Sequence, residues 1–153
     1  MEIVAVENET QLGQVRELFE EYWRSFGFTP CFQNFAAEVA GLPGKYAPPE
    51  GRLALATIAD LPAGCVALRP IDRQRCEAKR LYVRPQHRGL GVGRALMDWA
   101  IAEARSAGYR EMAGDTMPVM ERALAMYARM GFERTEAYTG DPTPGAIYLR
   151  LKL

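Results

Sequence analysis

The sequence has a single histidine, only three cysteines and no long apolar run. One histidine with dispersed cysteines is too poor a ligand set for a zinc site. The cysteines, Cys31, Cys65 and Cys76, are odd in number and lack CxxC spacing, which favours reduced core residues over disulfides. No stretch approaches the ~20 apolar residues of a membrane span, and residues 1–7 lack the pattern of a signal peptide. We therefore expect a cytoplasmic protein that uses neither a metal ion nor a membrane.

Net charge is also absent, but the charged residues are distributed unevenly. The 19 basic and 19 acidic residues cancel, which argues against nonspecific binding of nucleic acid. Residues 69–94 hold eight basic and two acidic residues, a net charge of +6, whereas residues 1–50 hold eight glutamates and three basic residues, a net charge of −5. Solvated faces explain any one of these charges. Together they indicate an anionic ligand in mid-chain and a cationic one that approaches from the N-terminal third.

The sequence does contain enough apolar surface for one domain. Its 153 residues are 48% hydrophobic and 25% charged, which is ordinary for a globular protein with a sizeable core. No linker, repeat or low-complexity tract divides the chain, so residues 1–153 are expected to form a single domain. Hydrophobic periodicity and turn residues predict strands at 3–6, 52–58, 65–69, 76–83, 111–115, 132–134 and 147–153, and helices at 10–26, 32–40, 94–107 and 118–130.

This order predicts an α/β (α+β) fold with an antiparallel N-terminal half and one strand–helix–strand crossover in the centre. Thr10 is expected to cap the first helix, Pro118 to lie in the first turn of the last one, and Gly108 and Gly131 to end the last two. The Gly- and Pro-rich segment 41–51 is either a plain connector or the edge of a substrate pocket.

The segment CEAKRLYVRPQHRGLGVGR at 76–94 is the one around which the chain is organised. Its first eight residues are expected to form a strand. By alternation, one face of this strand carries Glu77, Lys79, Leu81 and Val83. Pro85 ends regular pairing, and three closely spaced glycines then lead into a helix-forming run. A strand, a glycine loop and a helix start in that order form an anion site, because free N–H groups and the helix dipole point at the ligand.

Two common phosphate-binding motifs fit this segment poorly. The P-loop needs a lysine and then a hydroxyl after its last glycine, whereas Arg94 and Ala95 follow Gly93 here. The dinucleotide fingerprint needs a third small residue where this sequence has Leu96 or Arg94. Asp115 ends the next strand, where a ribose ligand is expected, so a dinucleotide enzyme stays open as an alternative. The antiparallel start of the fold opposes it.

The third motif, Arg88-x-x-Gly91-x-Gly93, resembles the acetyl-CoA signature of the GNAT superfamily of N-acetyltransferases. The resemblance extends over nearly the whole chain and includes LYVRP at 81–85 and ALAMYARMGF at 123–132. It implies a mixed, mainly antiparallel central sheet of about six to seven strands, splayed in the middle and flanked by about four helices. It also implies an enzyme that moves an acetyl group from acetyl-CoA to a primary amine.

The resemblance further implies which residues hold acetyl-CoA. The pyrophosphate would lie against the amides at the helix start, and the pantetheine and acetyl group would pair with the preceding strand like an added strand. The residues implied for the pyrophosphate are Arg88, Gly89, Leu90, Gly91, Val92, Gly93 and Arg94. Those implied for the pantetheine are Leu81, Tyr82 and Val83. A bulge would splay their strand from the strand at 111–115.

The resemblance implies two catalytic residues. Tyr127 matches the tyrosine that protonates the leaving thiolate in many members, and Glu77 matches a position of the general base. By residue pattern alone, Tyr127 equally fits an apolar core stripe, and Glu77 could simply pair with Lys79 or an arginine. His87 or water could also serve as the base, and Met120 stands where many members have an asparagine. No nucleophile set of the Ser/His/Asp or Cys/His type is evident, so direct transfer in a ternary complex is expected.

No motif specifies the acceptor. The acidic N-terminal third indicates a cationic amine, on a small molecule or a peptide, that enters beside the first helices and the segment 41–51. A homodimer is a common assembly in the superfamily. The alternative class is a non-catalytic acyl-CoA-binding regulatory module, which would keep the glycine loop and lack turnover.

Overall fold

The computed structural model describes residues 1–27, 34–140 and 142–153. Seven strands form one mixed sheet in the order β1-β2-β3-β4-β5-β7-β6. The strands are β1 Glu2–Ala5, β2 Arg52–Ile58, β3 Leu61–Pro70, β4 Arg75–Val83, β5 Glu111–Thr116, β6 Glu133–Thr135 and β7 Ile147–Lys152. Only β4 and β5 pair in parallel, through the crossover helix α3; the other neighbours are antiparallel. The expected mixed sheet with an antiparallel N-terminal half is confirmed.

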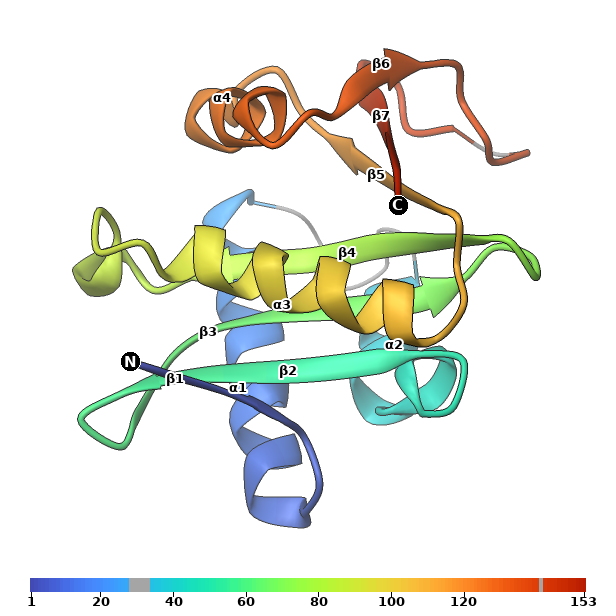
Figure 1. The fold of residues 1–153 in the computed structure, drawn as a ribbon. Helices are drawn as coiled ribbons and strands as arrows, with labels where there is room; N and C mark the ends of the chain where they lie inside the picture. Colours follow the sequence, from blue (N-terminus) through green and yellow to red (C-terminus); the bar gives the residue numbers. More distant parts are fainter. Residues whose placement is uncertain (28–33, 141) are drawn as a thin grey trace.

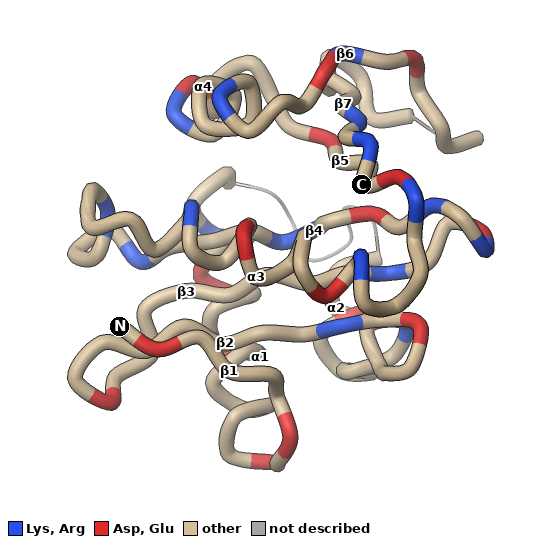
Figure 2. Tube along the Cα trace, viewed as in Figure 1, with Lys and Arg blue, Asp and Glu red and all other residues tan. Residues whose placement is uncertain are grey.

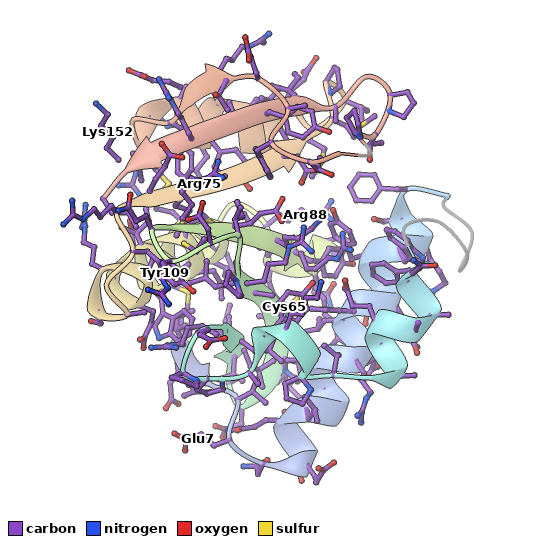
Figure 3. The ribbon with its side chains drawn as sticks, turned by 90° about the vertical axis from the view of Figure 1, so that its right-hand side faces the viewer. Glu7, Cys65, Arg75, Arg88, Tyr109 and Lys152 are labelled. Atoms are coloured by element: carbon purple, nitrogen blue, oxygen red, sulfur yellow. The ribbon has the colours of Figure 1, made fainter. Side chains whose placement is uncertain are left out.

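Helices cover both faces of this sheet. Within the described ranges they are α1 Glu9–Ser25, α2 Phe35–Ala40, α3 Val92–Ser106 and α4 Glu121–Arg129, with short 3-10 turns η2 Gly44–Tyr46 and η3 Pro85–His87. Figure 1 shows α3 in front of the sheet with α1 behind it. The view turned by 90° shows α3 on one side of the strands and α1 and α2 on the other (Figure 3). None of the helices in these ranges is long and apolar enough to cross a membrane.

Two hydrophobic cores lie on the two faces because β2 and β3 bury both of their sides. Alternate residues such as Ala56 and Leu68 pack with Leu96 of α3, and α4 adds half-buried side chains to this cluster. The intervening residues, such as Leu55, pack with Phe19 of α1 and with residues of α2 and η2. Strands covered on both faces have nearly continuous apolar sequences, which is the pattern of 52–58 and 63–68.

The sheet is splayed between β4 and β5. Their pairing is limited to Arg75–Glu77 against Glu111–Ala113, after which the two strands diverge (Figure 1). Arg80 has a φ of +60°, and the register of β4 against β3 shifts beside it. This bulge inserts one extra residue, so the side chains beyond it change faces. The predicted splaying bulge is therefore present.

The same bulge makes the predicted face of this strand wrong. Leu81 and Val83 pack on the α3 side of the sheet, together with Ala78. Glu77 lies opposite Arg69, and Tyr82 packs in the core under α1. Simple alternation cannot hold across an extra residue, because each inserted residue reverses the side on which the following side chains lie.

Several predicted ends of elements also need correction. The N-cap of α1 is Asn8, whose side chain accepts a hydrogen bond from the Gln11 amide at 2.9 Å, and not Thr10. Pro118 precedes α4, which begins only at Glu121. Gly108 and Gly131 do follow their helices, with φ of +91° and +94°. The predicted start of α2 and Cys31 lie outside the described residues.

The turn between β2 and β3 is tight, because Ala59 and Asp60 both have positive φ, as in a type I′ hairpin, and β3 therefore starts at Leu61.

The thiols of Cys65 and Cys76 are free and buried, as expected of core residues. Burial raises the pKa of both thiols, so they are held protonated.

Candidate active site

A cleft opens where β4 and β5 separate. It has a volume of about 660 Å³ and lies between the end of β4, the segment 88–94, the last turn of α1 and the helix α4. The predicted cofactor residues that line it are Leu81, Tyr82, Val83, Arg88, Gly89, Gly91, Val92, Gly93 and Arg94. The one predicted residue outside this lining is Leu90, whose side chain is 60% exposed to solvent. The structure thus gathers residues of a strand, a loop and a helix start around one space.

The start of α3 supplies free backbone donors to this cleft. Gly91 caps the helix with a φ of +82°, and the first intrahelical bond runs from the Ala95 amide to its carbonyl at 3.0 Å. The amides of Val92, Gly93 and Arg94 therefore have no partner within the helix. Together with the helix dipole, these N–H groups form a site for an anion such as a phosphate.

Four arginines add positive charge to the cleft. Arg88 and Arg94 come from the segment before and within α3, and Arg122 and Arg129 from α4. Figure 2 shows basic residues on α4 and on the segment that leads into α3. The two arginines of α4 were not among the residues predicted from the sequence, because only the apolar stripe of that helix entered the prediction. Their place on its polar face, seven residues apart, was the available signal.

The edge of β4 toward β5 is a second source of backbone groups. From Lys79 to Val83 this strand pairs with β3 on one side and with no described strand on the other. Arg88 holds the end of this edge, because its Nε donates to the Val83 carbonyl at 3.0 Å and its guanidinium lies over the Tyr82 ring at 5.9 Å. An extended chain in the cleft can therefore pair with β4 as a strand would.

Tyr127 lies on α4 at the bottom of the splay. It lines an inner cavity of about 30 Å³ together with Tyr22, Lys79 and Asp115, which is room enough for a water molecule. Burial raises the pKa of the Tyr127 phenol, and the nearby Tyr22 and Asp115 raise it further. Among the described residues its hydroxyl has no hydrogen-bond partner. The phenol is therefore protonated at neutral pH and available to a ligand.

The side chain of Glu77 is buried and does not face solvent. Its side chain is 3% exposed, and Oε1 accepts a hydrogen bond from Arg69 Nε at 2.6 Å. Oε2 accepts one from the hydroxyl of Tyr138 at 2.5 Å, and Lys79 Nζ lies 3.9 Å from Oε1. The expected pairing with lysine and arginine is thus present. Burial and the Glu77 charge raise the pKa of Tyr138, which keeps this tyrosine a donor.

Asp115 is a carboxylate that the catalytic prediction did not include. It is half-buried near the end of β5 and lines the inner cavity with Tyr127 and Lys79. Within the part of the chain that the structure describes, no ion pair or hydrogen bond occupies its carboxylate. Its place after the crossover helix was noted in the sequence, but only for a ribose ligand. The splay, which brings β5 opposite β4, could not be deduced from that spacing.

His87, which the sequence also raised, lies apart from this arrangement, and Met120 has an apolar side chain. His87 lies in η3 and lines neither the cleft nor the inner cavity. Met120 lines both, and its sulfur accepts a hydrogen bond from the Thr116 hydroxyl at 3.2 Å. The described residues contain no group of three histidine, cysteine, aspartate or glutamate side chains placed to hold a metal ion.

Solved structures of acetyltransferases share this architecture. An acetyltransferase of Streptococcus agalactiae matches with a TM-score of 0.83 at 20% identity, over 99% of this chain and 98% of that one. A GNAT family acetyltransferase of Elizabethkingia anophelis, solved with acetyl-CoA bound, matches with a TM-score of 0.59 at 24% identity, over 68% of this chain and 77% of that one. At such identities the likeness shows the fold alone.

Sequence comparison gives the family. The acetyltransferase (GNAT) family matches residues 12–132. An uncharacterized N-acetyltransferase of Schizosaccharomyces pombe is 38% identical over 153 residues, which cover 99% of this chain and 94% of that protein. The chain belongs to the acetyltransferase (GNAT) family and is an acetyltransferase, so the resemblance noted in the sequence is confirmed.

Proposed function

We propose that the protein transfers the acetyl group of acetyl-CoA to the amine of an acceptor by direct transfer in a ternary complex. The observation that carries this proposal is the single cleft of about 660 Å³ in which the unpaired edge of β4 leads to the free amides of α3. A strand edge fits an amide-containing chain, and a helix start fits a phosphate. Pantetheine joined to a pyrophosphate has these two parts in that order.

The cofactor contacts follow from this arrangement. The pyrophosphate lies against the amides of Val92 to Arg94, with the four arginines of the cleft around it. The pantetheine runs along Leu81 to Val83, and the thioester reaches the splay beside Tyr127. Acetyl-CoA in the structure from Elizabethkingia anophelis supports the choice of this cosubstrate over a dinucleotide.

In the reaction, the acceptor amine loses a proton and attacks the thioester carbonyl. A C–N bond forms, the C–S bond breaks, and the phenol of Tyr127 gives its proton to the departing thiolate. The raised pKa of Tyr127 supports this role, because it keeps the donor protonated at neutral pH. Holding both substrates in one splay supplies the orientation that the attack needs.

Two carboxylates are candidates for the base. Glu77 is the one implied by its position on β4, but both of its oxygens already accept hydrogen bonds. Asp115 has a carboxylate without a partner among the described residues and shares the inner cavity with Tyr127. The geometry favours Asp115 as the group that receives the proton, directly or through a water in that cavity, with Glu77 holding β4 and the loop at 136–140 together.

The experiment that tests the function measures release of the CoA thiol with a thiol reagent, from acetyl-CoA and a panel of primary amines. An enzyme releases CoA faster with at least one amine than without any, and the acetylated amine is found by mass spectrometry. Saturable binding of acetyl-CoA without amine-dependent release across the panel would instead support the non-catalytic acyl-CoA-binding module.

A further inference from the structure

A second cavity lies on the face of the sheet that carries α1 and α2. Its volume is about 420 Å³, and it lies between α2, the segment 41–46 and the end of β3. The charged residues in its lining are Glu38, Lys45 and Arg69. This cavity is separate from the cleft proposed for acetyl-CoA, and none of its lining residues lines that cleft.

The negative charge in this lining is already neutralised. Arg80 Nε lies 2.9 Å from Glu38 Oε2, and Arg80 Nη2 lies 3.1 Å from Oε1, so the guanidinium binds the carboxylate in a bidentate manner. The guanidinium is held over the rings of Phe35 and Trp23, at 4.8 and 5.5 Å from their centroids. Glu38 therefore acts as a fixed partner of Arg80 and adds no free acceptor to the cavity.

The positive charge in the lining is only partly used. Arg69 Nε donates a hydrogen bond to Glu77, while the two terminal nitrogens of Arg69 donate to no residue that the structure describes. Its side chain remains 31% exposed. Lys45 is exposed on the segment 41–46 and forms no ion pair with the described residues. The cavity therefore has two cationic side chains with unused donors, Arg69 and Lys45, and its carboxylate is already paired with Arg80, which suits an anionic group.

The cavity adjoins the catalytic splay through two ion pairs. Arg80 lines the inner cavity with Tyr127 and reaches Glu38 in the second cavity. Arg69 holds Glu77, which lies beside Lys79 of the same inner cavity. These two ion pairs lie between the two cavities. A molecule with one end in each cavity must therefore have several bonds between its two ends.

We infer that this second cavity binds the acidic group of the acceptor, so that the acceptor is a carboxylate-bearing amine whose two charged ends are several bonds apart. The inference rests on the proposed acetyl transfer and names its substrate class. It also revises the expectation drawn from the acidic N-terminal third. Glu17 and Glu21 pair with Arg84, and Glu38 with Arg80, so these carboxylates are not left to attract a cation.

The binding test does not require turnover. Hexanoate and hexanamide are titrated into ¹⁵N-labelled protein, and amide shifts of residues 41–46 are followed by NMR. We expect saturable shifts with hexanoate and none with hexanamide. Lys45→Met should weaken hexanoate binding about two- to fivefold, the range of one exposed charge contact, while Lys152→Met on β7 should leave it unchanged. Equal shifts from the two probes, or an unchanged affinity in Lys45→Met, overturn the inference.

The turnover test compares matched acceptors that differ only in charge. 6-Aminohexanoate is compared with 6-aminohexanamide, and triglycine with triglycine amide, which separates a small amino acid from a peptide C-terminus. The acid of at least one pair should have a KM about tenfold below that of its amide at similar kcat, and Lys45→Met should narrow this gap. Equal KM values in both pairs contradict the inference. Absence of CoA release with every amine contradicts the proposed function instead, and the NMR titration still decides on the acidic subsite.

Discussion

The phenol of Tyr127 lies in the inner cavity with a raised pKa and without a described hydrogen-bond partner. If it donates a proton to the thiolate, Tyr127→Phe should lower kcat about 100-fold and leave the dissociation constant of acetyl-CoA within about twofold. Tyr109→Phe is the matched control, because that hydroxyl donates to the Glu50 carbonyl at 2.8 Å away from the cleft. Steady-state kinetics and calorimetry check both variants. A kcat of Tyr127→Phe equal to that of the parent removes the assigned role.

The choice of base is decided by comparing Glu77→Gln with Asp115→Asn. Removing the base removes its contribution to the rate, which is about 100-fold or more. We expect Asp115→Asn to lower kcat/KM about 100-fold and to leave the melting temperature unchanged. Glu77→Gln should leave kcat/KM near that of the parent and lower the melting temperature, because it disturbs the buried contacts with Arg69 and Tyr138. The opposite result would identify Glu77 as the base, and parental kcat/KM in both variants would point to water.

The Glu38–Arg80 pair predicts a pH dependence of stability. Burial raises the pKa of Glu38, but the hydrogen bonds and charge of Arg80 outweigh it, so the pKa lies below the ordinary 4.5. A carboxylate whose pKa is lower in the folded than in the unfolded state stabilises the fold at pH values above its unfolded-state pKa. This contribution is lost as the pH falls through its folded-state pKa. Glu38→Gln should therefore cost about 2–3 kcal/mol at pH 7, and progressively less below pH 4.5.

Urea unfolding between pH 3 and 7 measures this difference. Asp98→Asn is the matched control, because Asp98 and Arg94 form an ion pair with both side chains more than half exposed. Such a pair is worth less than about 0.5 kcal/mol. A free-energy difference between the parent and Glu38→Gln that stays constant from pH 7 to pH 3 would contradict the assignment.

At the scale of single elements, the start of α3 depends on a glycine. Gly91 has a φ of +82°, a conformation that costs an alanine about 1–2 kcal/mol. Gly91→Ala should lower the melting temperature and weaken acetyl-CoA binding about tenfold, because the amides of Val92 to Arg94 would be displaced. Gly13→Ala is the control: Gly13 lies inside α1 with nothing near a Cβ, and the change should stabilise by about 0.5–1 kcal/mol. Differential scanning calorimetry measures the stability of both variants, and calorimetric titration measures their affinity for acetyl-CoA. An affinity of Gly91→Ala for acetyl-CoA equal to that of the parent would contradict the proposed phosphate contact.

The elements differ in how far the sequence could predict them. The glycine segment and the alternation of β7 are local patterns, and these were found with nearly the observed bounds. The bulge at Arg80 is set by Glu38 and two aromatic rings from distant helices, so nothing in the strand itself indicated it. Asn8 and Thr10 are both good caps, and only the direction of the entering chain decides between them.

The candidate site shows the same limit. The predicted cofactor residues are close together in the chain and line the cleft, apart from Leu90, which is exposed to solvent. Arg122 and Arg129 come to the cleft, and Asp115 to the inner cavity, only because β5 and α4 turn away from β4 at the splay. Long-range geometry of this kind is fixed by packing of the two cores and not by any local pattern.

At the scale of the whole molecule, the sheet consists of β1–β4 and β5–β7 joined by a short parallel ladder of three residue pairs. A ligand that pairs with β4 and contacts α4 bridges these two parts. Acetyl-CoA should therefore stabilise the folded state as a whole. At 100 times its dissociation constant, binding adds about 2.7 kcal/mol, which corresponds to a rise in melting temperature of roughly 5–10 °C for a chain of this size.

The most direct measurement is a calorimetric titration of the folded protein with acetyl-CoA, accompanied by thermal unfolding with and without the ligand. We expect saturable heat from one site per chain, a higher melting temperature, and the loss of much of both in Gly91→Ala. A folded protein that gives no heat and no change in melting temperature at millimolar acetyl-CoA would contradict the account of the glycine loop, the cleft and the acetyl transfer together.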